Sequence, residues 1–200
     1  MRHSLRSIQS SLPLQHCFGC GPANERGLQL ATYTSASLKR VGFSLWRGTS
    51  PDHCAGPPDV VNGGILSTLV DCVGCALACG SRVDLTKTWN VTGRLDVKYL
   101  APTPISSTLV LLGRVRELTD TDEQPQQNVP WADPFTSRRA RVDVAVYASN
   151  APAILPEIVD AAATSDVSTW MDRIDSEAKL TCVGSVYTVE VKPEWSTSKL

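Results

Sequence analysis

The sequence predicts an α+β fold in which one buried helix is followed by an antiparallel meander of strands. After Asn62, residues 60–79 are apolar almost throughout, and the segments beyond them alternate apolar and polar residues, which is typical of half-buried strands. A chain of 200 residues suits one domain with insertions and a substantial core. We expect that domain over residues 16–195, with a flexible tail at 1–15 and a C-terminal tail at 196–200.

The apolar run at residues 60–79 organises the chain. Its start also fits a hairpin with Asn-Gly at the turn, but the run is longer than most strands, which favours a helix. Asn62 is then the N-cap, and Gly63 and Gly64 form the first turn. A helix that is apolar on nearly all sides must be buried on nearly all sides.

One charged group, Asp71, interrupts this helix. Gly64, Thr68, Asp71 and Cys75 follow the spacing i, i+4, i+7, i+11, so they share one helix face. This polar strip, defined by those four residues, is expected to line a groove that ends at Asp71.

Composition excludes several classes of partner. The net charge of −1 gives no general attraction to nucleic acid or to an anionic membrane, and no run is expected to span a bilayer, because the helix contains Asp71 and several small residues. The basic, serine-rich start is short and has no secretory apolar core. Seven cysteines, three of them close together on the helix, indicate a reduced, cytoplasmic protein.

Cys17 and Cys20 form a Cys-x-x-Cys pair. Such a pair can hold zinc, but four ligands are wanted and no second pair lies at a suitable spacing. His16 and His53 are the candidates to complete a site. The favoured interpretation is a tight glycine turn whose thiols pack as small apolar groups, so we expect no metal.

The other elements are predicted in chain order. Residues 27–46 form two strands or one interrupted strand, and a loop rich in Pro and Gly at residues 49–59 carries His53. Strands are expected at residues 89–100, 107–118, 137–149 and 180–191, with insertions at about 119–135 and 150–178. In the second insertion Val167, Trp170, Met171 and Ile174 have the spacing of an amphipathic helix.

Three motifs lie in register: Cys17-Phe18-Gly19-Cys20-Gly21 before Gly27-Leu28; Val61-Asn62-Gly63-Gly64-Ile65 with Thr68, Leu69 and Asp71; and Val91-Thr92 with Leu95, Val97, Tyr99, Leu100 and Pro102. In these motifs the chain resembles the hotdog-fold thioesterases, specifically the PaaI-like acyl-CoA thioesterase group. The resemblance implies a hotdog fold, a curved antiparallel β-sheet wrapped around one central helix, with a helical insertion before the last strand. It also implies active sites between subunits, hence a homodimer or a dimer of dimers.

For this chain the resemblance implies hydrolysis of an acyl-CoA or acyl-carrier thioester without a cofactor. Asp71 would act as general base or as nucleophile, and the amides of Gly63 and Gly64 would form the oxyanion hole. The family usually has histidine where Asn62 stands, and asparagine cannot exchange a proton near neutral pH. Asn62 is therefore a cap, a catalytic contact or both. A purely structural Asp71, bonded to Thr68 or a backbone amide, is the alternative.

Thr92 matches a family position where a hydroxyl of the neighbouring subunit orients water. Its parity, opposite to that of Leu95 and Val97, directs it away from its own helix, although an ordinary strand threonine fits as well. Arg94 and Lys98 are candidate ligands for coenzyme A phosphates, and a solvated sheet face is the alternative for each.

Thr68 and His53 complete the candidate substrate-binding residues. Two other functions stay open: a non-catalytic hotdog module that binds a thioester, and a hotdog dehydratase, for which only His53 is placed to serve. The insertion at 150–178 is expected to form a partial lid near the acyl pocket.

Overall fold

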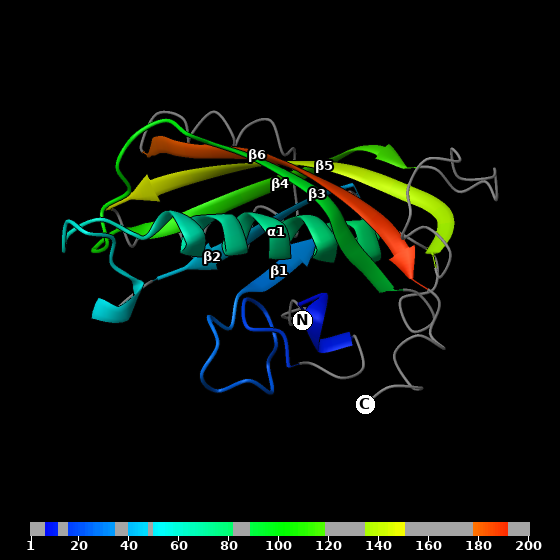
Figure 1. The fold of residues 1–200 in the computed structure, drawn as a ribbon, viewed down its shortest axis with the longest axis horizontal. Coiled ribbons are helices and arrows are strands. Elements are labelled where there is room, and N and C mark those ends of the chain that lie inside the picture. The colour runs from blue at the N-terminus through cyan, green and yellow to red at the C-terminus, as the bar shows by residue number, and fades with distance from the viewer. Residues whose placement is uncertain are drawn as a thin grey trace, which may run out of the picture.

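The computed structural model describes residues 7–11, 16–34, 40–47, 50–81, 89–118, 135–150 and 178–191. They form a curved antiparallel sheet around one long helix (Figure 1). The elements in chain order are η1 (Gln9–Ser11), β1 (Ala31–Thr34), β2 (Val41–Trp46), η2 (Pro51–His53), α1 (Gly63–Gly80), β3 (Trp89–Tyr99), β4 (Thr108–Leu118), β5 (Phe135–Ser149) and β6 (Lys179–Val191). Nearly all of the expected insertions, and the C-terminal tail, lie outside the described residues.

Helix α1 confirms the helical interpretation of the apolar run. Asn62 has extended backbone angles, and its Oδ1 accepts the Gly64 N–H at 2.8 Å, which is the geometry of an N-cap. The helix contacts all six strands and lies inside the curve of the sheet (Figure 1). Its fully buried side chains include Leu69, Val73 and Leu77, so burial on nearly all sides is confirmed.

By length and composition α1 could cross a bilayer, contrary to the expectation from the sequence. It has 18 residues and a mean hydropathy of 1.6. More than half of that stretch is buried inside the protein, because the helix is wrapped by the sheet. Its apolar character is thus explained by its place in the core.

The sheet order is β1-β2-β4-β5-β6-β3. The predicted meander is correct for β4, β5 and β6, but β3 pairs with β6 instead of β4. Residues 100–107 connect β3 to β4 across the sheet, and Pro102 lacks the N–H that would continue the β3 ladder. Their backbone groups bond elsewhere: Val61 N–H donates to Thr103 O at 2.9 Å, and Leu100 N–H to Thr181 O at 2.8 Å.

Residues 7–11 pack on the domain, so the flexible tail expected over residues 1–15 is wrong for this part. Ile8 is 5% exposed, and its N–H donates to Thr32 O at 2.9 Å. The Gln9 side chain donates to Thr32 Oγ1 and accepts the Thr32 N–H. Ile8 fits here because Gly80 lacks a side chain: a Cβ on Gly80 would lie 2.8 Å from Ile8 Cδ1.

Glycines bring the helix and the sheet into close contact. A Cβ added to Gly74 would lie within 2.8 Å of three side-chain carbons of Val186. A Cβ on Gly184 would lie 2.7 Å from a methyl group of Val70. These approaches are closer than real Cβ atoms make, so the helix position depends on the missing side chains.

We predict that Gly74→Ala destabilises the fold by up to about 2 kcal/mol, because overpacking costs about 1–3 kcal/mol and the gain in helix propensity offsets about 1 kcal/mol. Gly56→Ala is the control, since nothing lies within 4 Å of a Cβ at that position. Urea unfolding monitored by circular dichroism measures both. Equal stability of the two variants would contradict the packing described for α1.

Candidate functional site

The polar strip on α1 is less buried than the rest of the helix. Thr68 and Asp71 are half-buried, whereas Leu69, Val70 and Val73 are fully buried. The Thr68 hydroxyl donates to Gly64 O at 2.8 Å, one turn back along the helix. Thr68 is therefore not the partner of Asp71.

The hydrogen-bond partner of Asp71 is Thr92 on β3. Thr92 Oγ1 donates to Asp71 Oδ1, and Cys75 Sγ lies 3.1 Å from Thr92 Oγ1. Because the Thr92 proton is directed at the carboxylate, the Cys75 thiol is the donor of the second bond. Within the described part of the chain no hydrogen bond reaches Asp71 Oδ2, which leaves that oxygen to bind water or substrate.

The parity predicted for Thr92 is wrong. Thr92 pairs with Thr188 but Arg94 pairs with Tyr187, so Gly93 is an extra residue in the ladder. Such a bulge reverses the alternation of side chains on its two sides. Thr92 therefore faces the helix of its own chain, together with Leu95.

The carboxyl of Asp71 has a raised pKa. Burial is the largest cause, the Thr92 hydrogen bond opposes it, and the negative charge of Cys17 adds to it. Desolvation disfavours the charged form of an acid. The result is an acid whose proton affinity is higher than that of a solvated aspartate.

The first turn of α1 has fewer free donors than the sequence suggests. The Gly64 N–H is bonded to the Asn62 side chain, and the Leu66 N–H donates to Asn62 O at 3.1 Å. Among the described residues, the amides of Gly63 and Ile65 are left as the unbonded donors of this turn. They, with the side-chain amide of Asn62, are available to a bound anion or carbonyl.

Tyr99, at the end of β3, also bonds to the first turn of α1, and sequence reasoning missed it. Its hydroxyl donates to Gly63 O at 2.8 Å and lies 2.7 Å from Ser67 Oγ, yet 51% of the residue is exposed. The alternation of side chains along β3 could have identified it, because that alternation places Tyr99 on the same face of the strand as Leu95.

His53 lies beside the helix start. The Asn62 N–H donates to His53 O at 2.8 Å, and the imidazole packs against Trp46 with 5.3 Å between ring centroids. Its Nδ1 is buried and has no partner among the described residues. Its predicted role in substrate binding stays a prediction.

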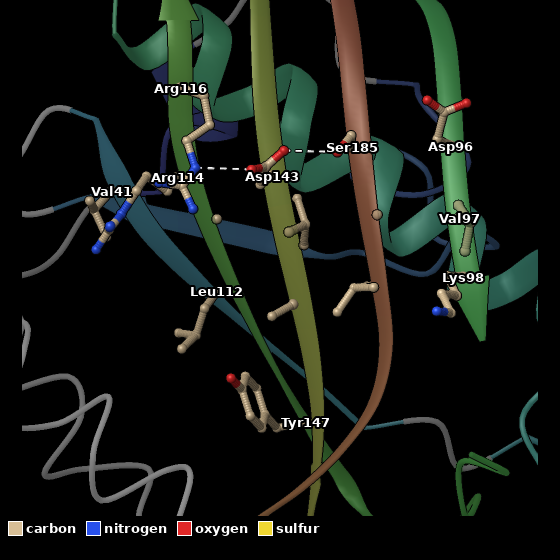
Figure 2. A pocket seen from close by; sticks show the side chains of 15 residues that line it. Val41, Asp96, Val97, Lys98, Leu112, Arg114, Arg116, Asp143, Tyr147 and Ser185 are labelled. Carbon is tan, nitrogen blue, oxygen red and sulfur yellow. Dashed lines mark hydrogen bonds and ion pairs between the residues drawn. The ribbon is translucent and has the colours of Figure 1, made fainter. Parts of the chain in front are cut away.

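Arg94 and Lys98 lie on the opposite face of the sheet from Asp71. Arg94 pairs with Asp96 at 2.9 Å and lies over the ring of Tyr187. Figure 2 shows this face, with α1 behind the sheet and Lys98 at the rim of a groove of about 520 Å³. The groove contains the Asp143 cluster, in which Arg116 and Ser185 bond to the carboxylate at 2.9 and 2.8 Å. Neither basic residue is brought near Asp71 within one chain.

Three thiols meet at Cys72, the residue that follows Asp71 in α1. The Sγ atoms of Cys17, Cys20 and Cys72 all lie within 4.8 Å of one another. Hydrogen bonds from the thiols of Cys20 and Cys72 lower the pKa of Cys17 well below its usual range. Neither His16 nor His53 belongs to this group.

No protein-family model and no curated protein matches this sequence. Solved structures, in contrast, do resemble this chain in fold. Zebrafish thioesterase superfamily member 2 superposes with a TM-score of 0.55 over 92% of this chain and 98% of its own, at 11% identity. The chain has the hotdog fold of the thioesterase superfamily.

Two bacterial structures agree with this assignment. The E. coli PaaI protein from the phenylacetic acid degradation operon gives a TM-score of 0.50 over 82% of this chain and 80% of its own, at 10% identity. A hypothetical thioesterase of Streptococcus pneumoniae TIGR4, solved with coenzyme A, gives 0.50 over 82% and 86%, also at 10% identity. The predicted hotdog fold is confirmed, and at these identities the likeness concerns the fold alone.

We predict that Asp71→Asn makes this hotdog domain more stable near neutral pH. An acid with a raised pKa in the folded state stabilises the fold only while it is protonated, so stability is lost as pH rises through that pKa. The advantage of Asp71→Asn over the parent should therefore grow with pH and vanish below about pH 4, the ordinary range for aspartate. Urea unfolding across a pH series measures it.

Asp143→Asn is the matched control and should behave in the opposite way. Burial raises the pKa of Asp143, but Ser185, Arg116 and Arg141 outweigh it and the pKa is lowered. Its contribution is present above the unfolded pKa and is lost as pH falls, so Asp143→Asn should be less stable than the parent near pH 7. Identical pH profiles for the two variants would contradict both assignments.

Proposed function

We propose that this chain hydrolyses an acyl thioester, with Asp71 as the reacting acid. The observation that carries the proposal is the state of this carboxylate on an otherwise apolar helix: Oδ1 is held by Thr92, and Oδ2 is left open. A partly buried carboxylate is costly unless it is bonded, and an acid with a raised pKa within a partly exposed polar strip is a candidate for catalysis.

Two reaction routes use the same oxygen. As general base, Asp71 takes a proton from water while the water oxygen bonds to the thioester carbonyl carbon; the C–S bond then breaks and the thiolate leaves with that proton. As nucleophile, Asp71 bonds to the carbonyl carbon itself, the thiolate leaves, and water hydrolyses the resulting anhydride. In both routes the oxyanion needs donors, for which the amides of Gly63 and Ile65 are suited.

Two copies of the chain are needed for this chemistry. Gly63 and Asp71 are eight residues apart on α1, or about 12 Å at 1.5 Å per residue, so one carbonyl cannot contact both in the same chain. We therefore propose that the helix start of one chain faces Asp71 of a partner, in a homodimer or a dimer of dimers. Among the described strands β3 pairs only with β6, so its outer edge is open to a second copy.

We propose a coenzyme A thioester as the substrate, since the pneumococcal neighbour was solved with coenzyme A; an acyl-carrier thioester would react in the same way. Lys98, which is exposed, stays a candidate phosphate ligand, whereas Arg94 is already paired with Asp96. All seven cysteines are free, which fits the cytoplasmic location that we propose.

One observation favours the alternative of a binding module without turnover. Asn62 occupies the Gly64 N–H, so one predicted oxyanion donor is already used. The dehydratase alternative has less support, since among the described residues Asp71 is bonded to a hydroxyl and to no imidazole.

We predict that the purified chain releases free thiol from at least one member of a panel of acyl-CoA substrates. Asp71→Asn should lower kcat about 10²–10⁴-fold, the usual contribution of a positioned general base. Thr92→Val should move the rise of activity with pH to higher pH, because it removes the bond that lowers the Asp71 pKa. Thr92→Ser keeps the hydroxyl and is the control.

The outcomes separate the hypotheses. Saturable binding of acyl-CoA without thiol release would support the binding module and end the hydrolase proposal. Hydrolysis by Asp71→Asn at the parent rate would remove Asp71 from the mechanism.

A shared site can be tested by complementation. We predict that Asp71→Asn and Gly64→Val are each inactive, since the added valine blocks access to the first-turn amides. Co-expressed with two different tags and purified through both, the mixed dimer should recover about half of the parent activity, because one of its two sites is intact in a symmetric dimer. A mixed dimer without activity would show that each site lies within one chain.

A further inference from the structure

We propose that Cys17, Cys20 and Cys72 bind one thiophilic divalent cation, for which Zn²⁺ is the best fit. The sequence shows only the Cys-x-x-Cys pair, which is why no metal was expected. The fold supplies a third ligand, Cys72, which follows Cys20 by 52 residues and reaches the pair from α1. All three Sγ atoms lie within 4.8 Å of one another.

The spacing of the thiols suits tetrahedral zinc. A Zn–S bond of about 2.3 Å in a tetrahedron places sulfur atoms about 3.8 Å apart. The Sγ atoms of Cys17 and Cys72 are 3.8 Å apart, and the third thiol needs to move by about 1 Å at most to meet the same spacing. Cys17 is exposed, so the fourth position faces solvent and can be filled by water.

The turn that carries the pair is built to lie on the helix. Gly19 is buried, and a Cβ there would overlap Cys72 Sγ and lie 2.8 Å from the Thr68 methyl group. Backbone bonds hold the turn: Leu28 N–H donates to Phe18 O at 2.7 Å, and Leu30 N–H to Gly19 O at 2.9 Å. The ligand positions are therefore set by the packed backbone.

A metal accounts for this arrangement better than a disulfide does. A disulfide joins two sulfur atoms and would leave the third thiol of the group without a role, while a tetrahedral cation uses all three. Bound zinc would fasten the N-terminal turn to α1 at the residue next to Asp71. The proposal does not rest on thioester hydrolysis, because neither reaction route uses these thiols.

The test uses the full chain, reduced and freed of metal, titrated with Co²⁺. We expect one Co²⁺ per chain, with a sulfur-to-cobalt charge-transfer band, the visible bands of tetrahedral cobalt, and displacement by Zn²⁺. Cys17→Ser and Cys20→Ser should weaken binding at least about 100-fold, since each removes a direct ligand. Cys54→Ser, outside the group, should bind like the parent.

Folding is checked separately by circular dichroism of each metal-free variant. Zn²⁺ should raise the melting temperature of the parent and of Cys54→Ser, but not that of Cys17→Ser, because ligand binding to the folded state stabilises it. Three results would overturn the proposal: a reduced parent without cobalt bands, serine variants that bind like Cys54→Ser, or a reduced chain that binds no metal and only forms a disulfide in air.

Discussion

The enclosure of α1 by the sheet is the constraint on which the rest of this structure depends. The helix contacts all six strands, and each large apolar side chain that it buries contributes about 2 kcal/mol. Sliding or rotating the helix would expose several of them at once. Each helix position is therefore tied to one neighbour: Asp71 to Thr92, Cys72 to the N-terminal turn, and Gly74 to Val186. The polar strip is held in place because the apolar side chains beside it are packed in the core.

Local signals were enough to predict the elements themselves. The N-cap at Asn62, the helix over the apolar run and the presence of the strands are read from neighbours in the chain, and these are confirmed. Strand pairing is not local, because β3 pairs with β6, which lies about 90 residues later in the chain, while residues 100–107 bond to the loop ahead of α1 and to Thr181. The packing of Ile8 over Gly80 could not be predicted either, because it also joins residues far apart in the chain.

At the candidate site, too, the sequence predicted residues that stand out locally but not the contacts between distant segments. Asp71 stands out in the sequence because a lone charge in an apolar helix needs a partner. Its partner was expected to be Thr68 or a backbone amide, whereas Thr92 was singled out only for a site in a neighbouring subunit. The extra residue at Gly93 reverses the side chains that precede it in β3, and a single glycine does not reveal a bulge in the sequence. Tyr99 and Cys72 went unassigned because their contacts join segments far apart in the chain.

Consecutive residues of a helix point about 100° apart, so Asp71 and Cys72 contact two different parts of the protein although they are neighbours in α1. Asp71 meets β3, where a hydroxyl holds its carboxylate, and Cys72 meets the Cys17–Cys20 turn, which covers the part of the helix that the sheet leaves open. The two surroundings are not independent, since the charge of Cys17 contributes to the raised pKa of Asp71. The position of the N-terminal turn therefore influences both the packing of the helix and the proton affinity of its acid, and Gly19 allows that position because a side chain there would overlap Cys72.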